Sequence, residues 1–107
     1  MKVSNQRELL ELAAKAVGWR VQWPDEVVRE DGSSWRWNPL TDDGDALRLA
    51  VKLGIQITQY RPTDRNTVGS VSTYYDREFV ESYKPAGEMA ATRRAIVRAA
   101  AALGSKK

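Results

Sequence analysis

The chain has no histidine and no cysteine among its 107 residues. Histidine is the usual general base near neutral pH and the commonest metal ligand, while cysteine supplies nucleophilic thiolates, disulfides and soft metal sites. Triads that pair serine or cysteine with histidine therefore cannot form. Catalysis would have to rest on carboxylates, lysine, tyrosine or arginine. We expect a protein that is not an enzyme and that holds no cofactor.

Acidic side chains gather in the turn Thr41-Asp42-Asp43-Gly44-Asp45. Such a turn could offer oxygens to Ca²⁺, but that ion takes about six to eight of them. Here an amphipathic helix follows at once, without the downstream bidentate glutamate of an EF-hand. Capping by Thr41 or Asp42, with further carboxylates at the positive end of the helix dipole, explains the same residues. The turn is typical of a helix cap, and we expect no metal.

Four tryptophans lie at strand spacing, as the pairs Trp19 with Trp23 and Trp35 with Trp37. Residues two apart in a strand share a face, so a sheet face packed beneath a helix accounts for them. Tryptophan is also enriched at the centres of protein interfaces. Because Trp35 and Trp37 belong to a hairpin arm, we expect these two to be the more exposed pair.

Positive charge is concentrated towards the C-terminus of a chain whose net charge is +3. Residues 84–107 contain six basic side chains and one acidic side chain. Arg93, Arg94 and Arg98 could bind an acidic protein or the phosphates of a nucleic acid. A solvated helix face has the same composition, and no helix-turn-helix or other nucleic-acid motif is evident.

Further candidates lie in the loop of residues 61–66 and in the strands after it. Tyr74 and Tyr75 are adjacent, so in a strand they point to opposite faces and one of them is expected outside. An exposed tyrosine beside Arg77 would form a small binding spot, although cross-strand packing also explains it. The complete set of candidate partner-binding residues is Trp35, Trp37, Arg61, Arg65, Tyr74, Arg77, Arg93, Arg94 and Arg98.

The elements that must position these side chains follow the order helix, strands, helix, strands, helix. Apolar residues at helical spacing predict helices over residues 6–17, 43–53 and 87–103. Alternating apolar and polar residues predict strands over residues 19–23, 27–30, 33–37, 55–60, 67–75 and 78–83. Asp31-Gly32 is typical of a two-residue hairpin turn. The helices are expected to end at Gly18, Gly54 and Gly104.

Three amphipathic helices and strands with apolar faces predict an α+β fold. We expect one domain over residues 1–107, arranged as an α-β-α layered sandwich with three helices packed on an antiparallel or mixed sheet. The last three residues are expected to be frayed. No apolar run reaches the ~18 residues that cross a bilayer, and the first residues lack the apolar core of a secretory signal.

Three segments resemble the phage ABA sandwich family, whose members are small phage or prophage proteins of unknown function. They are the helix and tryptophan-bearing strand of residues 9–23, the motif Asn38-Pro39-Leu40-Thr41-Asp42 before its helix, and residues 90–97. The resemblance spans most of the chain but omits the Asp31-Gly32 hairpin and residues 61–83. It implies the layered α-β-α arrangement and action in the cytoplasm of a host bacterium. It brings no catalytic residues.

Together these observations favour a small phage accessory protein that acts by stoichiometric binding to a host bacterial protein. Inhibition of a defence complex, in the manner of an anti-CRISPR protein, is a natural example. Two alternatives are nucleic-acid binding through the basic C-terminal helix and capture of a small molecule or nucleotide in an aromatic-lined pocket. A homodimer without further function is a third, and the sequence does not separate a monomer from a homodimer.

Overall fold

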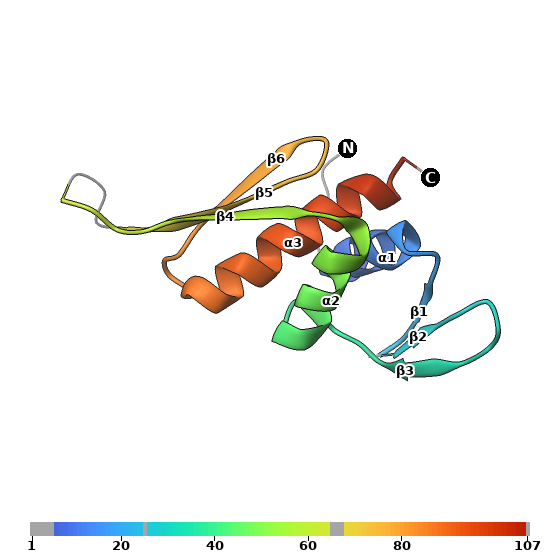
Figure 1. The fold of residues 1–107 in the computed structure, drawn as a ribbon. Helices are drawn as coiled ribbons and strands as arrows, with labels where there is room; N and C mark the ends of the chain where they lie inside the picture. The colour runs from blue at the N-terminus through green and yellow to red at the C-terminus, as the bar shows by residue number, and fades with distance from the viewer. Residues whose placement is uncertain (1–5, 25, 65–67, 107) are drawn as a thin grey trace.

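The structure is a computed structural model that describes residues 6–24, 26–64 and 68–106. Within them the elements follow the predicted order, and the α+β class is confirmed (Figure 1). The helices are α1 (Gln6–Ala16), α2 (Asp43–Leu53) and α3 (Glu88–Gly104). The strands are β1 (Arg20–Gln22), β2 (Glu26–Val28), β3 (Ser34–Arg36), β4 (Gln56–Tyr60), β5 (Ser70–Tyr74) and β6 (Glu78–Ser82).

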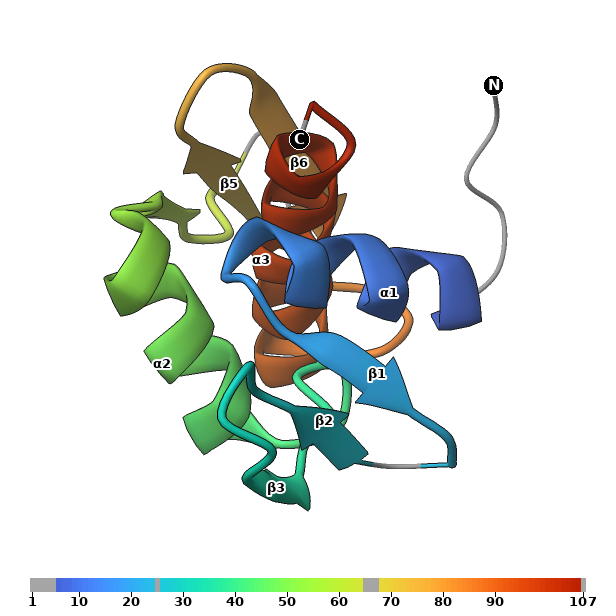
Figure 2. The ribbon, with the colours of Figure 1, turned by 90° about the vertical axis from the view of Figure 1, so that its right-hand side faces the viewer.

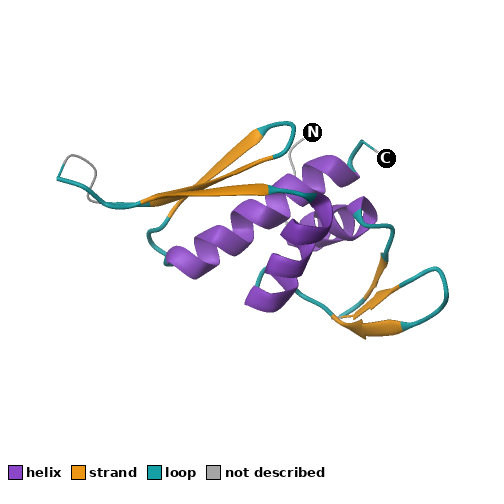
Figure 3. Cartoon of the chain, viewed as in Figure 1, coloured by secondary structure: helices purple, strands orange, loops and turns teal. Residues whose placement is uncertain are grey.

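The strands form two antiparallel sheets, β1-β2-β3 and β4-β5-β6, rather than one. In each sheet every strand pairs with its neighbour in the chain. Figure 3 shows the two sheets on opposite sides of the helices. The chain leaves the first sheet at β3 and forms α2 before it reaches β4, so α2 connects the two sheets.

Helix α3 is the central element of the packing. It contacts β5 and β6 of the β4-β5-β6 sheet, which is the larger sheet because its strands are longer. It also contacts α1 and α2. Thr73 of β5 is fully buried and donates its Oγ1 hydrogen bond to the carbonyl oxygen of Ala95 at 2.8 Å, which fastens the sheet to the helix. The main core lies among the helices and the first sheet and includes Leu10, Val27, Trp37, Leu49, Ile96 and Val97. A smaller core lies beneath the larger sheet and contains Val71, Tyr83, Ala91 and Ala95.

Helix α1 crosses α3 (Figure 2). The crossing depends on small side chains. Alanines are buried on both helices, among them Ala13 and Ala100. A Cβ on Gly104 would lie 1.8 Å from the carbonyl oxygen of Leu12. The helix does end at this glycine, but not through a left-handed stop, because Gly104 is not among the glycines with positive φ. Its role is to let two helix backbones approach.

The β2–β3 hairpin occurs where the sequence predicts it, but the predicted turn size is wrong. The Arg29 amide donates to the Ser33 carbonyl at 2.9 Å, and the Gly32 amide donates to the Arg29 carbonyl at 3.0 Å. These bonds enclose a three-residue loop in which Gly32 has a φ of 87°. A left-handed glycine at the third loop position is characteristic of such loops.

Two of the last three residues make contacts with the rest of the fold. Of the three residues expected to fray, Ser105 donates to the Ala102 carbonyl at 2.8 Å, and Lys106 forms an ion pair with Asp76. Lys107 lies outside the described residues. None of the helices in the described ranges is long and apolar enough to cross a membrane.

Candidate functional site

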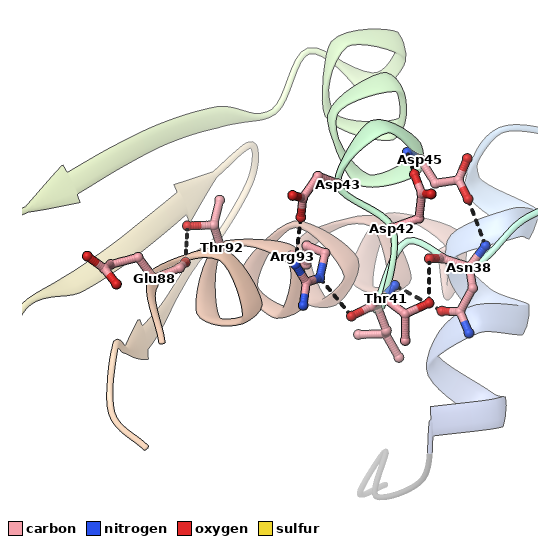
Figure 4. Close-up of polar contacts among 9 residues, drawn as sticks. Asn38, Thr41, Asp42, Asp43, Asp45, Glu88, Thr92 and Arg93 are labelled. Carbon is pink, nitrogen blue, oxygen red and sulfur yellow. Dashed lines mark hydrogen bonds and ion pairs between the residues drawn. The ribbon is translucent and has the colours of Figure 1, made fainter. Parts of the chain in front are cut away.

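The acidic turn before α2 is a helix cap (Figure 4). Asp42 accepts a hydrogen bond from the Asp45 amide at 2.8 Å, and the Asp45 carboxylate in turn accepts from the Asn38 amide at 2.9 Å. The other oxygen of Asp45 accepts from Arg48 at 2.9 Å. The capping interpretation is therefore confirmed, with Asp42 as the capping residue. Among the described residues, no group of three or more acidic side chains is placed to hold a metal ion.

Arg93 belongs to this cap and not to a basic face of α3 (Figure 4). Its Nε donates to the Leu40 carbonyl at 2.8 Å, and its Nη1 lies 2.5 Å from an oxygen of Asp43. Only 19% of the Arg93 side chain is exposed. Arg93 therefore points away from Arg94, because successive helix residues point about 100° apart. A partner contact by Arg93 stays a prediction.

Three of the four tryptophans, Trp19, Trp35 and Trp37, pack against one another. Trp37 is 6% exposed, so the expectation that it is one of the more exposed tryptophans is wrong. Trp35 and Trp37 are two residues apart, so both rings lie on the side of the hairpin that faces Trp19. Both contact the Trp19 ring edge-on, with centroid distances of 4.8 Å for Trp35 and 5.9 Å for Trp37. Trp35 is half-buried, and Arg29 lies 4.6 Å from the centroid of its ring. A partner contact by Trp35 stays a prediction.

Other candidates from the sequence are scattered over the surface. Arg61 is exposed just beyond β4, and Arg65 lies outside the described residues. Tyr74 is 50% exposed at the end of β5 and Tyr75 is 53% exposed in the turn after it. Both tyrosines are therefore outside, because the strand ends at Tyr74 and the alternation of faces does not extend to Tyr75.

Three of the predicted residues come together in a cleft of about 810 Å³ between α1, α3 and β6. Arg94 and Arg98 lie one helical turn apart on α3, and Arg77 reaches the cleft from the turn before β6. The remaining lining combines apolar and charged side chains, among them Leu9, Leu12, Lys15, Phe79, Glu81 and Ala101. We call this hollow the α1–α3–β6 cleft.

Glu81 joins the two arginines of α3. One of its oxygens forms a close ion pair with Nη1 of Arg98, and the other lies 3.8 Å from Nε of Arg94. Glu81 is 19% exposed, Arg98 38% and Arg94 47%. Arg94 is therefore the more accessible cation and has the looser contact.

The Phe79 ring contacts two guanidinium groups. The Cζ atom of Arg77 is 5.1 Å from the centroid of the ring, and that of Arg98 is 5.0 Å away. Both distances are within the range of cation–π attraction. These contacts place both guanidinium groups against the aromatic ring.

The cleft carries a positive excess. Lys15, Arg77, Arg94 and Arg98 line it together with the acidic Glu8 and Glu81. A hollow lined mainly by one sign of charge concentrates ligands of the opposite sign. Arginine also binds carboxylate and phosphate through paired hydrogen bonds. The arrangement can therefore hold an anion beside an apolar or aromatic group.

Sequence reasoning did not identify Lys15, Phe79 and Glu81 as members of this site. Lys15 fits a solvated helix face, and Phe79 and Glu81 fit an ordinary alternating strand. The sequence does indicate that Phe79 and Glu81 share one face of β6, because they are two residues apart in a strand. Which helix covers that face cannot be read from local sequence.

Comparison of the chain with models of known protein families, with curated proteins and with solved structures finds no match.

Proposed function

We propose that this chain is a stoichiometric binding protein whose α1–α3–β6 cleft takes an acidic region of a protein partner. The convergence of Arg77, Arg94 and Arg98 around Phe79 carries the proposal. Arginine and aromatic side chains are the types that dominate the energetics of protein interfaces. Stable interfaces bury roughly 800 Å² on each partner, an area that a cleft and its rims can provide on a domain of this size.

The finer proposal concerns the partner. The likeness of residues 38–42 and their flanking elements to the phage ABA sandwich family supports a small phage accessory protein that acts in the cytoplasm of a host bacterium. Its target would then be a host protein, with a component of a defence complex as the natural example. Occupation of the target, without chemical conversion, would be the mode of inhibition, because the sequence lacks histidine and cysteine.

A second candidate function is binding of a nucleotide or another small anionic molecule. The cleft volume of about 810 Å³ lies within the roughly 300–1,000 Å³ of small-molecule sites. Phe79 with its flanking arginines could stack a base and hold a phosphate. Nucleic acid would use the same cations. The mixed apolar and charged lining favours a protein segment over either, since a polynucleotide needs cations at regular intervals along its backbone.

The test is affinity capture from host lysate with three versions of the chain, followed by quantitative mass spectrometry. Arg94→Glu reverses an accessible charge of the cleft, and Lys52→Glu reverses a charge at an exposed position of α2 outside it. We expect a partner that is retained by the wild type and by Lys52→Glu but lost with Arg94→Glu. Equal recovery by all three versions would contradict the proposal, as would stabilisation only by nucleotides in a thermal-shift assay.

A further inference from the structure

A second hollow of about 400 Å³ adjoins the α1–α3–β6 cleft. It extends towards the beginning of α3, and its lining there includes Leu40, Pro85, Ala86 and Ala90. The two hollows share two lining residues, Glu81 and Arg94. They are thus two halves of one groove along α3, with the contact between Glu81 and Arg94 at the junction. We call it the α3 groove.

The lining changes along the α3 groove. At the junction the groups are charged, with Arg94 and Arg98 around Glu81. One half beyond it combines Leu9, Leu12 and Phe79 with the charged Glu8, Lys15 and Arg77. The other combines Pro85, Ala86 and Leu40 with Lys84. An occupant that matches this order has a negative group in the middle and apolar groups on both sides. An extended peptide can present such groups in succession along its length, whereas a small molecule bound in one hollow would leave the other empty.

Glu81 marks the place of the negative group. Its carboxylate already lies between the two arginines, and its contact with Arg94 at 3.8 Å is loose. Arg94 is half-exposed and can turn towards a ligand while Arg98 keeps its close pairing with Glu81. The chain therefore carries its own carboxylate where an incoming one would bind.

We propose that the α3 groove binds an extended acidic peptide segment of the protein partner, whose carboxylate takes the place of Glu81 at Arg94. The inference rests on the proposed function and names the chemistry of the ligand. Glu81 acts as an internal competitor that lowers the affinity for unselected anions, so that binding needs the apolar side chains as well as the charge.

The probe is a pool of fluorescent nine-residue peptides with glutamate at the centre and leucine or phenylalanine at variable positions on both sides. A second pool has glutamine at the centre, and a thymidine oligonucleotide of nine nucleotides is the third probe. Each is titrated against the purified full chain and followed by fluorescence anisotropy. We expect the glutamate pool to bind more tightly than the other two.

Three variants test the position of the carboxylate. We expect Arg94→Gln to weaken binding of the glutamate pool by about fivefold, the ratio that corresponds to loss of one exposed ion pair. Glu81→Gln keeps the size of the side chain but removes the competing charge, so binding should tighten by about threefold. Glu30→Gln, an exposed change in the β2–β3 loop, should alter nothing. Circular dichroism confirms that each variant is folded.

Equal binding of the glutamate and glutamine pools, or a Glu81→Gln variant that binds less tightly, would overturn the inference. So would preferential binding of the oligonucleotide. If lysate capture still yields a partner that depends on Arg94, the proposed function stands while the inference about its ligand falls. If the glutamate pool binds as expected but capture yields no such partner, the groove has the inferred chemistry and the proposed function fails.

Discussion

Arg93 and Arg94 are adjacent in the sequence but have different physical roles. Arg93 donates to the Leu40 carbonyl and pairs with Asp43, so it fastens the start of α2 to α3. Arg94 projects towards β6 and keeps about half of its side chain exposed. In the sequence the two arginines look alike. In the helix their side chains point about 100° apart, so Arg93 makes structural contacts while Arg94 stays accessible.

This difference gives a matched pair of substitutions. We expect Arg93→Ala to lower the free energy of unfolding by about 1–2 kcal/mol, because it leaves the Leu40 carbonyl without its side-chain donor and removes an ion pair. Arg94→Ala should change it by less than about 0.5 kcal/mol. Urea denaturation measures both. Equal losses would mean that the contacts of Arg93 do not hold α2.

The carboxyl group of Asp31 is the clearest case of a perturbed acid. Its pKa is lowered from the ordinary 3.8 by the hydrogen bond from the Ser33 hydroxyl, then by the bond from the Ser33 amide, and further by the charge of Arg29. The two hydrogen bonds measure 2.6 Å and 2.9 Å. Because the folded pKa is the lower one, the ionised group stabilises the hairpin above the ordinary pKa, and this contribution is lost as the pH falls through the folded value.

We therefore expect Ser33→Ala to raise the pKa of Asp31 towards its ordinary value, since the largest of the causes is removed. The hairpin amides of the wild type should keep their native shifts to a lower pH than those of the variant. NMR titration of the Asp31 carboxyl carbon and of the Gly32 amide follows both effects. An identical titration of wild type and variant would show that the Ser33 hydroxyl does not act on Asp31.

Helices and caps are the elements that local sequence predicts best. The predicted bounds of α2 agree with the structure because its signals are all local, with Asp42 as cap and Gly54 as a left-handed end. Strand segments were also predictable from alternation, but their partners were not. The division into two sheets depends on pairing between segments, and the loop of the first hairpin depends on one extra residue that the Asp31-Gly32 motif does not reveal.

The close approach of α1 and α3 predicts different effects for two glycines. We expect Gly104→Ala to destabilise the fold by about 1–3 kcal/mol, because its Cβ would collide with backbone of α1. Gly44→Ala in α2 meets the end of the Arg48 side chain at 3.1 Å and Oδ1 of the capping Asp42 at 3.2 Å. These are side-chain atoms rather than backbone, and alanine is the better helix former, so we expect this change to cost less than about 1 kcal/mol. Thermal denaturation compares the two. A tolerated Gly104→Ala would mean that the helices are not packed backbone to backbone.

The whole molecule is organised around α3, which contacts the larger sheet on one side and α1 and α2 on the other. The same helix supplies Arg94 and Arg98 to the α1–α3–β6 cleft, so the site rests on the most heavily packed element. These two arginines could be named from their spacing in the sequence. Lys15, Phe79 and Glu81 could not, because they reach the cleft only after α1 and β6 have packed on α3.

The modest positive excess of the cleft limits how strongly salt should act. Raising sodium chloride from 50 to 200 mM should weaken binding of an acidic segment by roughly threefold, because a few partly exposed ion pairs are screened. A nucleic acid held by many phosphate contacts would lose about a thousandfold or more over the same range. Calorimetric titration at the two salt concentrations separates these cases, and a steep dependence would favour the nucleic-acid alternative.

The central proposal is that the chain works by occupying a partner through the α1–α3–β6 cleft. Calorimetric titration of the purified captured partner with wild type and with Arg94→Glu tests it most directly. We expect one chain to bind each partner site and Arg94→Glu to bind at least about tenfold more weakly, since a like charge then faces the acidic segment. Unchanged affinity of Arg94→Glu, with Lys52→Glu as the reference, would contradict the proposal.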